Sequence, residues 1–98
     1  MKGIEEIRED LNKIRYYNAK KEWFDKMETF VGRSEAADLS TKYNAVICKA
    51  HPRVYEFYVN MYVFNNTQET IADDLDYSMT YIGKLSKMMM EYLQSNID

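Results

Sequence analysis

The side chains that most often carry catalysis or bind metals are scarce in this sequence. It contains one cysteine, Cys48, and one histidine, His51, which stands directly before the only proline. His51 has no cysteine at a zinc-ligand spacing and no evident acid–base companion, so we interpret it as a residue at the start of a helix. Cys48 has only Lys49 nearby to activate its thiol, and we interpret it as a small buried apolar residue.

Three aspartates form the densest group of acidic residues, Asp73, Asp74 and Asp76. They lack the glycine and the distal glutamate of a calcium-binding loop, so we interpret them as a solvated acidic face or a protein-binding patch. The sequence also has no phosphate-binding loop and no nucleophile motif. We therefore expect a protein that is not an enzyme and that holds no metal and no other cofactor.

The composition is that of a soluble globular domain. The 98 residues are 46% hydrophobic and 30% charged, and 13 basic residues against 16 acidic ones give a net charge of −3. This balance argues against wholesale coating of nucleic acid. No run of eighteen apolar residues occurs, and charges at the N-terminus interrupt any signal-peptide pattern, so we expect a cytoplasmic protein that does not bind a membrane.

The elements that must position the remaining candidates are helices. Residues 4–31 contain no glycine or proline, and Ile4, Ile7, Leu11 and Ile14 recur at the spacing of one helix face. We expect one long helix here, or two helices broken near Asn18. The four residues form a narrow seam that predicts a homodimer, with packing onto the third helix of the same chain as the alternative.

Further apolar residues extend the helical pattern to residue 50. Phe24, Met27, Phe30 and Val31 continue an apolar face up to Gly32, which suits a helix C-cap. Ser34 suits the N-cap of a second helix over residues 35–49.

Proline in a first turn then predicts a third helix over residues 52–64. We expect an all-α fold of four to five helices, a single domain over residues 1–98 that consists of N-terminal helices (1–50) and a C-terminal part (52–94).

The C-terminal part has the most informative pattern. Thr67 suits the N-cap of a short helix, Ser78 suits the N-cap of a longer helix over residues 79–94, and three residues, 76–78, separate the two helices. The small side chain of Ala72 allows the two helices to cross closely. This arrangement is typical of a helix-turn-helix. In the longer helix we expect Met89 to face inward and Met88 or Met90 to lie on a partner surface.

From Thr67 to Leu93 the sequence resembles the helix-turn-helix of sigma-factor region 4, and more narrowly the phage late-gene activators of the ArpU and RinA type. The resemblance covers residues 52–94. It implies a phage or mobile-element transcription regulator that acts in the cytoplasm of a bacterial host, binds double-stranded promoter DNA and contacts RNA polymerase through the acidic first helix of the motif. The resemblance maps base contacts to Met79, Thr80, Tyr81 and Lys84 and a phosphate contact to Lys87. We add Ser78, at the start of the same helix, and Arg53, as a further backbone contact, to the expected DNA-binding residues.

Two other interpretations remain open. Residues 65–98 contain two lysines and six acidic residues, a net charge of −4, and phosphate neutralisation normally supplies most nonspecific affinity for DNA. Basic residues upstream, Arg33, Lys42, Lys49 and Arg53, would have to help contact the DNA backbone. The alternative is a small phage-encoded inhibitor that binds a host protein such as a nuclease or polymerase through Met79, Tyr81 and Met88. A third interpretation is a dimeric structural helix bundle.

Overall fold

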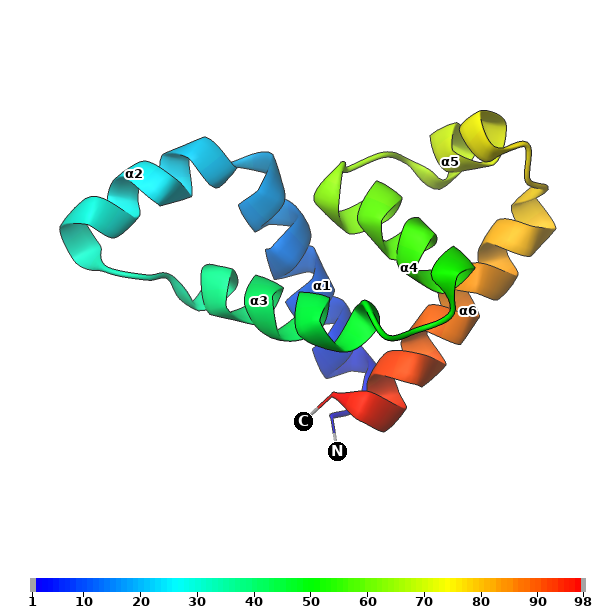
Figure 1. The fold of residues 1–98 in the computed structure, drawn as a ribbon, viewed down its shortest axis with the longest axis horizontal. Coiled ribbons are helices and arrows are strands. Elements are labelled where there is room, and N and C mark those ends of the chain that lie inside the picture. The colour runs from blue at the N-terminus through cyan, green and yellow to red at the C-terminus, as the bar shows by residue number, and fades with distance from the viewer. Residues whose placement is uncertain (1, 98) are drawn as a thin grey trace.

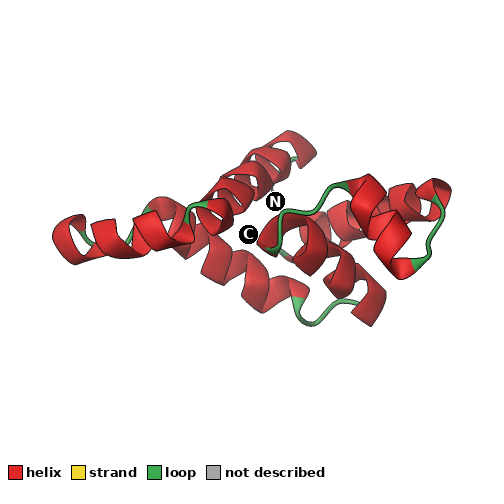
Figure 2. Ribbon diagram, turned by 90° about the horizontal axis from the view of Figure 1, so that it is seen from above, coloured by secondary structure: helices red, strands yellow, loops and turns green. Residues whose placement is uncertain are grey.

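The computed structural model describes residues 2–97, and these residues form helices and short loops without any strand (Figures 1 and 2). Six α-helices and one π-helical segment follow one another along the chain: α1 (Ile4–Ala19), α2 (Lys21–Val31), α3 (Glu35–Ile47), α4 (Pro52–Tyr58), η1 (Val59–Val63), α5 (Gln68–Leu75) and α6 (Met79–Asn96). The all-α prediction is confirmed. The expected number of helices was too low because the first apolar stretch is divided in two.

The helix starts follow the predicted capping residues. The hydroxyls of Ser34, Thr67 and Ser78 each accept a hydrogen bond from the backbone N–H three residues later, at 3.1 Å in all three cases. Pro52 begins α4, where His51 caps the helix by accepting a hydrogen bond at Nδ1 from the N–H of Arg53. Each cap satisfies an N–H group that the helix itself leaves without a partner.

The break between α1 and α2 lies at Lys20, two residues after the predicted position. The N–H of Lys20 still reaches the carbonyls of Tyr16 and Tyr17, but its φ and ψ of −114° and 25° leave the α-helical region. At this bend the Phe24 ring packs on the rings of Tyr16, Tyr17 and Trp23, with centroid distances of 5.0–6.0 Å. The aromatic contacts hold α2 at an angle to α1.

The core lies where α1, α3, α4, η1 and α6 meet (Figure 1). Its buried side chains come from both the N-terminal helices and the C-terminal part: Ile7, Leu11, Ile14, Tyr43, Ile47, Val54, Phe57, Tyr58, Ile71, Ala72, Ile82, Leu85, Met89, Leu93 and Ile97. Ile7, Leu11 and Ile14 are at most 1% exposed, so the stripe on α1 is covered by its own chain. The prediction that this stripe forms the seam of a dimer is therefore wrong, and the alternative packing within one chain is the one observed.

A polar cluster joins the N-terminus to α1 and α3. The Oδ2 atom of Asp10 accepts hydrogen bonds from the ammonium of Lys2 at 2.6 Å and from the hydroxyl of Tyr43 at 2.7 Å. Burial alone raises the pKa of Asp10, but the hydrogen bonds from Lys2 and Tyr43, together with the attraction of the positive charges of Lys2 and Lys13, hold that pKa below its usual value. Burial and the same contact raise the pKa of Tyr43, so Tyr43 stays neutral and donates to the carboxylate.

The third predicted helix, residues 52–64, is an α-helix in its first half and a π-helix in its second half. It begins as α4 and widens into η1, where the N–H of Phe64 donates to the carbonyl of Val59, five residues earlier. A π turn disturbs the regular ladder of backbone hydrogen bonds. The side-chain amide of Asn18 donates to the carbonyl of Tyr62 at 2.9 Å and so supplies a partner from the end of α1.

One expectation about burial is wrong, and one predicted apolar face lies uncovered. Cys48 is exposed, because it lies at the C-cap of α3 where the chain leaves the core. The apolar face expected over residues 24–31 is not covered: none of the α2 side chains, all of which the structure describes, is buried. Phe30 and Val31 are 82% and 74% exposed.

Candidate nucleic-acid interface

The residues singled out for DNA contact lie at the end of the molecule formed by α4, α5 and α6. α5 packs against η1 and α6, and three residues, 76–78, join it to α6. Asp76 makes the turn possible with a left-handed φ of 56°, and the N–H of Tyr77 donates to the carbonyl of Ala72 at 2.8 Å. Ala72 is 6% exposed and belongs to the core together with Ile82 and Leu85 of α6, as expected for a small residue between packed helices.

The first turn of α6 is oriented toward solvent. Met79 is 50% exposed, and Thr80 and Lys84 are exposed. Ser78 is exposed too, but its hydroxyl is engaged as the N-cap of α6, so its role in the structure is to begin the helix. Because residues four apart lie on one face of a helix, Thr80 and Lys84 form one exposed stripe.

Tyr81 is held by two neighbours rather than free. Its hydroxyl accepts a hydrogen bond from Nη1 of Arg53 at 3.0 Å, and its ring packs edge-on against Tyr77 at a centroid distance of 4.8 Å. The hydrogen bond from Arg53 raises the pKa of that guanidinium, which therefore stays cationic. The hydroxyl of Tyr77 in turn donates to Oε1 of Glu56 at 3.4 Å. Arg53 is thus brought from α4 to the first turn of α6.

Lys87 lies one turn beyond Lys84 on the same stripe. Its ammonium is 4.0 Å from Oε1 of Glu91, and both side chains are largely exposed. An exposed ion pair of this length holds its lysine weakly, because solvent screens the attraction. Lys87 can therefore turn to a phosphate group. The stripe of Thr80, Lys84 and Lys87 also contains Gly83, whose Cα faces open space: a Cβ built there has no neighbour within 4 Å.

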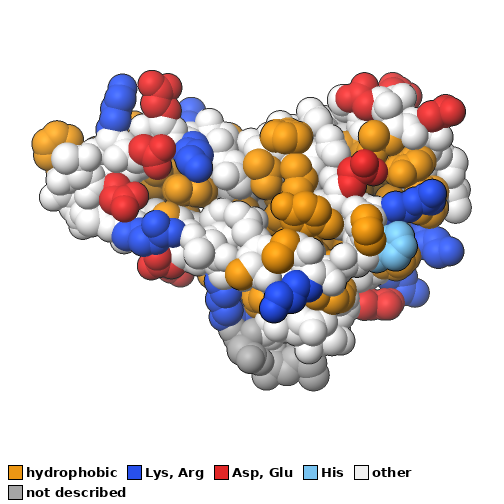
Figure 3. Space-filling view, in the orientation of Figure 1, with side chains coloured by type: hydrophobic (Ala, Val, Ile, Leu, Met, Phe, Trp, Pro, Cys, Tyr) orange, Lys and Arg blue, Asp and Glu red, His pale blue; other side chains and the backbone are white. Residues whose placement is uncertain are grey.

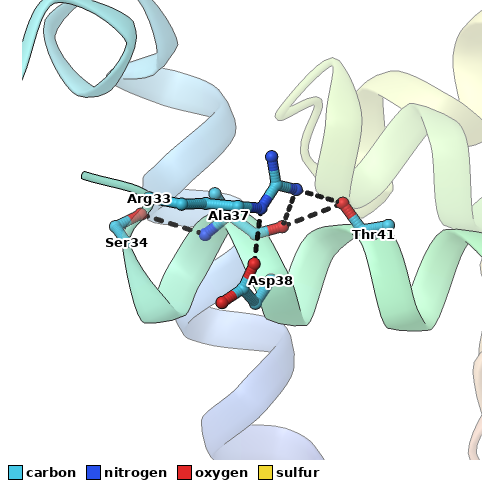
Figure 4. Close-up of polar contacts among 5 residues, drawn as sticks. All are labelled: Arg33, Ser34, Ala37, Asp38 and Thr41. Atoms are coloured by element: carbon cyan, nitrogen blue, oxygen red, sulfur yellow. Dashed lines mark hydrogen bonds and ion pairs between the residues drawn. The ribbon is translucent and has the colours of Figure 1, made fainter. Parts of the chain in front are cut away.

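The upstream basic residues do not all gather here. Arg33 precedes α3, at the end of the molecule away from the start of α6 (Figure 1). Its guanidinium folds over the first turn of α3, where it donates to Asp38, Thr41 and the carbonyl of Ala37 (Figure 4). The expectation that Arg33 assists the same DNA contact is wrong. Lys49 lies beside Tyr92 and Asn96 near the C-terminal end of α6, whereas Arg53 reaches the first turn of α6.

The charges divide this end of the molecule into two surfaces. Basic side chains gather over the first half of α6, and acidic side chains gather over α5 (Figure 3). The acidic residues of α5 are Glu69, Asp73 and Asp74, all of them exposed. A polyanion would therefore approach α6 from the side that faces away from α5.

Sequence reasoning identified the stripe but missed two features of it. Gly83 could have indicated the open surface. A glycine inside a helix lowers the stability of that helix, so its presence suggests a role outside the helix itself. The contact between Arg53 and Tyr81 joins residues 28 positions apart, and no local pattern indicates it.

Within residues 2–97, no three His, Cys, Asp or Glu side chains lie close enough together to hold a metal ion. None of the helices in these residues has the length and apolar character needed to cross a bilayer. No protein-family model, curated protein or solved structure matches the chain, so its function has to be argued from the residues and geometry described above.

Proposed function

We propose that the chain is a DNA-binding transcription regulator of the phage or mobile-element type that acts in a bacterial cytoplasm. In this proposal α5, residues 76–78 and α6 work as a helix-turn-helix similar to sigma-factor region 4. The observation that carries the proposal is the exposed stripe of Thr80, Lys84 and Lys87 on the first half of α6, with Arg53 beside it.

The geometry suits insertion of α6 into a major groove. The groove admits one α-helix, and a helix that enters it by its first turns can bring side chains to base edges. Thr80 and Lys84 offer a hydroxyl and an ammonium for these edges. Tyr81, fixed by Arg53 and Tyr77, presents its ring at the margin of the stripe. Lys87 and Arg53 are then left for phosphate groups.

The small number of cations limits the affinity. Lys84, Lys87 and Arg53 can neutralise about two to three phosphates, so the slope of log K against log salt is about −2 to −3. Binding by the isolated chain is therefore weak. RNA polymerase is the partner that supplies the missing affinity, through contacts with the exposed acids of α5.

One observation favours a second candidate, a phage-encoded inhibitor that binds a host protein. Met79 and Met88 are 50% and 38% exposed on the same helix, and flexible thioethers suit adaptable protein contacts. Residues 65–98 carry a net charge of −4, so such a partner would be basic as well as partly apolar.

The test is a selection from a random-sequence duplex library, followed by mobility shifts with and without bacterial RNA polymerase. We expect a sequence-preferring complex that the double variant Tyr81→Ala/Lys84→Ala abolishes, because each lost base contact costs about 1–3 kcal/mol. Lys20→Ala is the matched control: it removes one positive charge at the bend between α1 and α2 and leaves the stripe unchanged. Circular dichroism establishes that all variants keep their helices.

Two outcomes distinguish the transcription regulator from the inhibitor. Absence of a sequence-preferring complex at protein concentrations up to about 10 µM, with and without polymerase, contradicts the regulator. A complex with a host protein that survives nuclease treatment and is weakened by Met79→Ser supports the inhibitor.

A further inference from the structure

Helix α2, which we call the arm, has an apolar face that the rest of the chain leaves exposed. Trp23, Phe30 and Val31 are 55%, 82% and 74% exposed, and Tyr16 at the end of α1 adds a ring that is 58% exposed. The arm projects from the body of the molecule (Figure 1), and an apolar side chain is visible at its free end (Figure 3). With aromatic side chains that bury about 150–250 Å² each, the face offers about 500 Å² per chain, which is within the range of the largest apolar patches on monomers, patches that are often functional.

A hollow adjoins this face. Phe24, Met27 and Val31 line a pocket of about 300 Å³ that extends to the loop before α3. Phe24 and Met27 are only half-buried, so the pocket is an open groove along α2 and not a filled core. An apolar side chain from another molecule has room to enter it.

The charges beside the face indicate what covers it. On a helical projection, Lys21 and Glu28 lie along one flank of the apolar stripe, and Glu22 and Lys26 lie along the other. Each flank thus carries one positive and one negative charge. When two α2 helices pack antiparallel with a two-fold axis between residues 24 and 25, Lys21 meets Glu28 of the partner subunit and Lys26 meets Glu22 of the partner subunit. A parallel pair places Lys21 near Glu22 of the partner subunit instead, so exchanging the charges of residues 21 and 28 distinguishes the two orientations.

We propose that α2 is the interface of an antiparallel homodimer. The pair of arms buries about 1,000 Å² in total, the lower limit for a specific interface, so the dimer is weak. Lys26 and Glu22 are now paired within one helix at 3.9 Å with both side chains largely exposed, and this loose contact is readily exchanged for one across the interface. A lipid surface fits less well, because α2 has two lysines against three acids, whereas a membrane-surface helix is rich in basic residues.

The dimer is independent of the proposed DNA contact. α2 and the start of α6 lie at different ends of the molecule, so pairing through α2 leaves both copies of the α6 stripe exposed (Figure 1). The α1 stripe plays no part, since it is buried in each chain.

The mass of the full chain in solution, measured by sedimentation equilibrium up to about 1 mM, tests the proposal. We expect a monomer–dimer equilibrium, with emission of Trp23, the only tryptophan, shifting to shorter wavelength as the dimer forms. Phe30→Asp should raise the dissociation constant at least about tenfold, because it places a charge in an apolar contact. Phe30 is exposed, so the fold of this variant is preserved, which circular dichroism checks.

A charge exchange tests the orientation. Lys21→Glu and Glu28→Lys should each weaken self-association, while an equimolar mixture of the two variants, or both changes in one chain, should restore it. A monomeric mass across the concentration range would overturn the proposal, and so would a dimer that Phe30→Asp does not weaken. A monomer that binds lipid vesicles would overturn it as well and assign the face to a membrane.

Discussion

α2 and α6 are both amphipathic helices of the same chain, but the apolar face of only one of them is covered. Ile82, Leu85 and Met89 of α6 are at most 1% exposed, whereas Phe30 and Val31 of α2 are mostly exposed. α6 lies against α1, α3, α4 and α5, and α2 packs mainly on the end of α1. Periodicity in a sequence therefore defines an apolar face, while the neighbouring elements decide whether the same chain covers it.

The largest difference that we expect between α2 and α6 is in the stability lost when an apolar side chain is shortened. Leu85→Ala should lower the free energy of unfolding by about 2–5 kcal/mol, because it leaves a cavity in the core. Phe30→Ala removes a larger side chain but should change the free energy of unfolding by less than about 0.5 kcal/mol. Urea denaturation measures both, at a protein concentration low enough to keep the chain monomeric. A loss of similar size in the two variants would mean that the free chain covers α2.

The parts of the fold that could be predicted are those with local causes. Ser34, Thr67 and Ser78 begin helices because their hydroxyls satisfy backbone groups a few residues away, and Pro52 begins α4 because its ring suits a first turn. The inward positions of Ile71, Ala72 and Met89 followed from spacing alone.

The parts that could not be predicted depend on distant residues. The α1 stripe is covered by α3 and η1, and a sequence pattern is the same whether the cover comes from this chain or from a second one. The placement of Arg53 beside Tyr81 and of Arg33 beside Asp38 likewise follows from how the helices pack. Of the candidate site, the stripe on α6 was predictable and its neighbours were not.

The ion pairs of the core and of α2 differ in the same way as the apolar side chains, with a smaller expected effect on stability. Asp10 is nearly buried between Lys2 and Tyr43, whereas Glu22 on α2 meets Lys26 in open solvent. Because the pKa of Asp10 is lowered in the folded chain, the ionised form adds stability above the ordinary pKa of about 3.9, and that stability is lost as the pH falls through the folded value. Asp10→Asn should cost about 1–1.5 kcal/mol at neutral pH and flatten the loss of stability below pH of about 4.

Urea denaturation over a range of acidic pH measures this effect. Glu22→Gln is the control and should leave both the stability and its pH dependence unchanged, because its ion pair is exposed. If Asp10→Asn follows the same pH curve as the unaltered chain, the cluster of Lys2, Asp10 and Tyr43 does not stabilise the fold through its charge.

The smallest effect concerns the exposed side of α6. Gly83 has no neighbour that a Cβ would meet within 4 Å, so Gly83→Ala should stabilise the chain by about 0.5–1 kcal/mol through the better helix propensity of alanine. The fold alone thus gives no reason for the glycine. Because Gly83 lies one turn before Lys87 on the stripe proposed to enter DNA, the added methyl group should also weaken the DNA complex by hindering close approach. Thermal denaturation and the mobility shift measure the two effects on one variant. Greater stability with unchanged DNA binding would show that this part of the stripe stays clear of the duplex, and would shift the contact toward Met79 and Thr80.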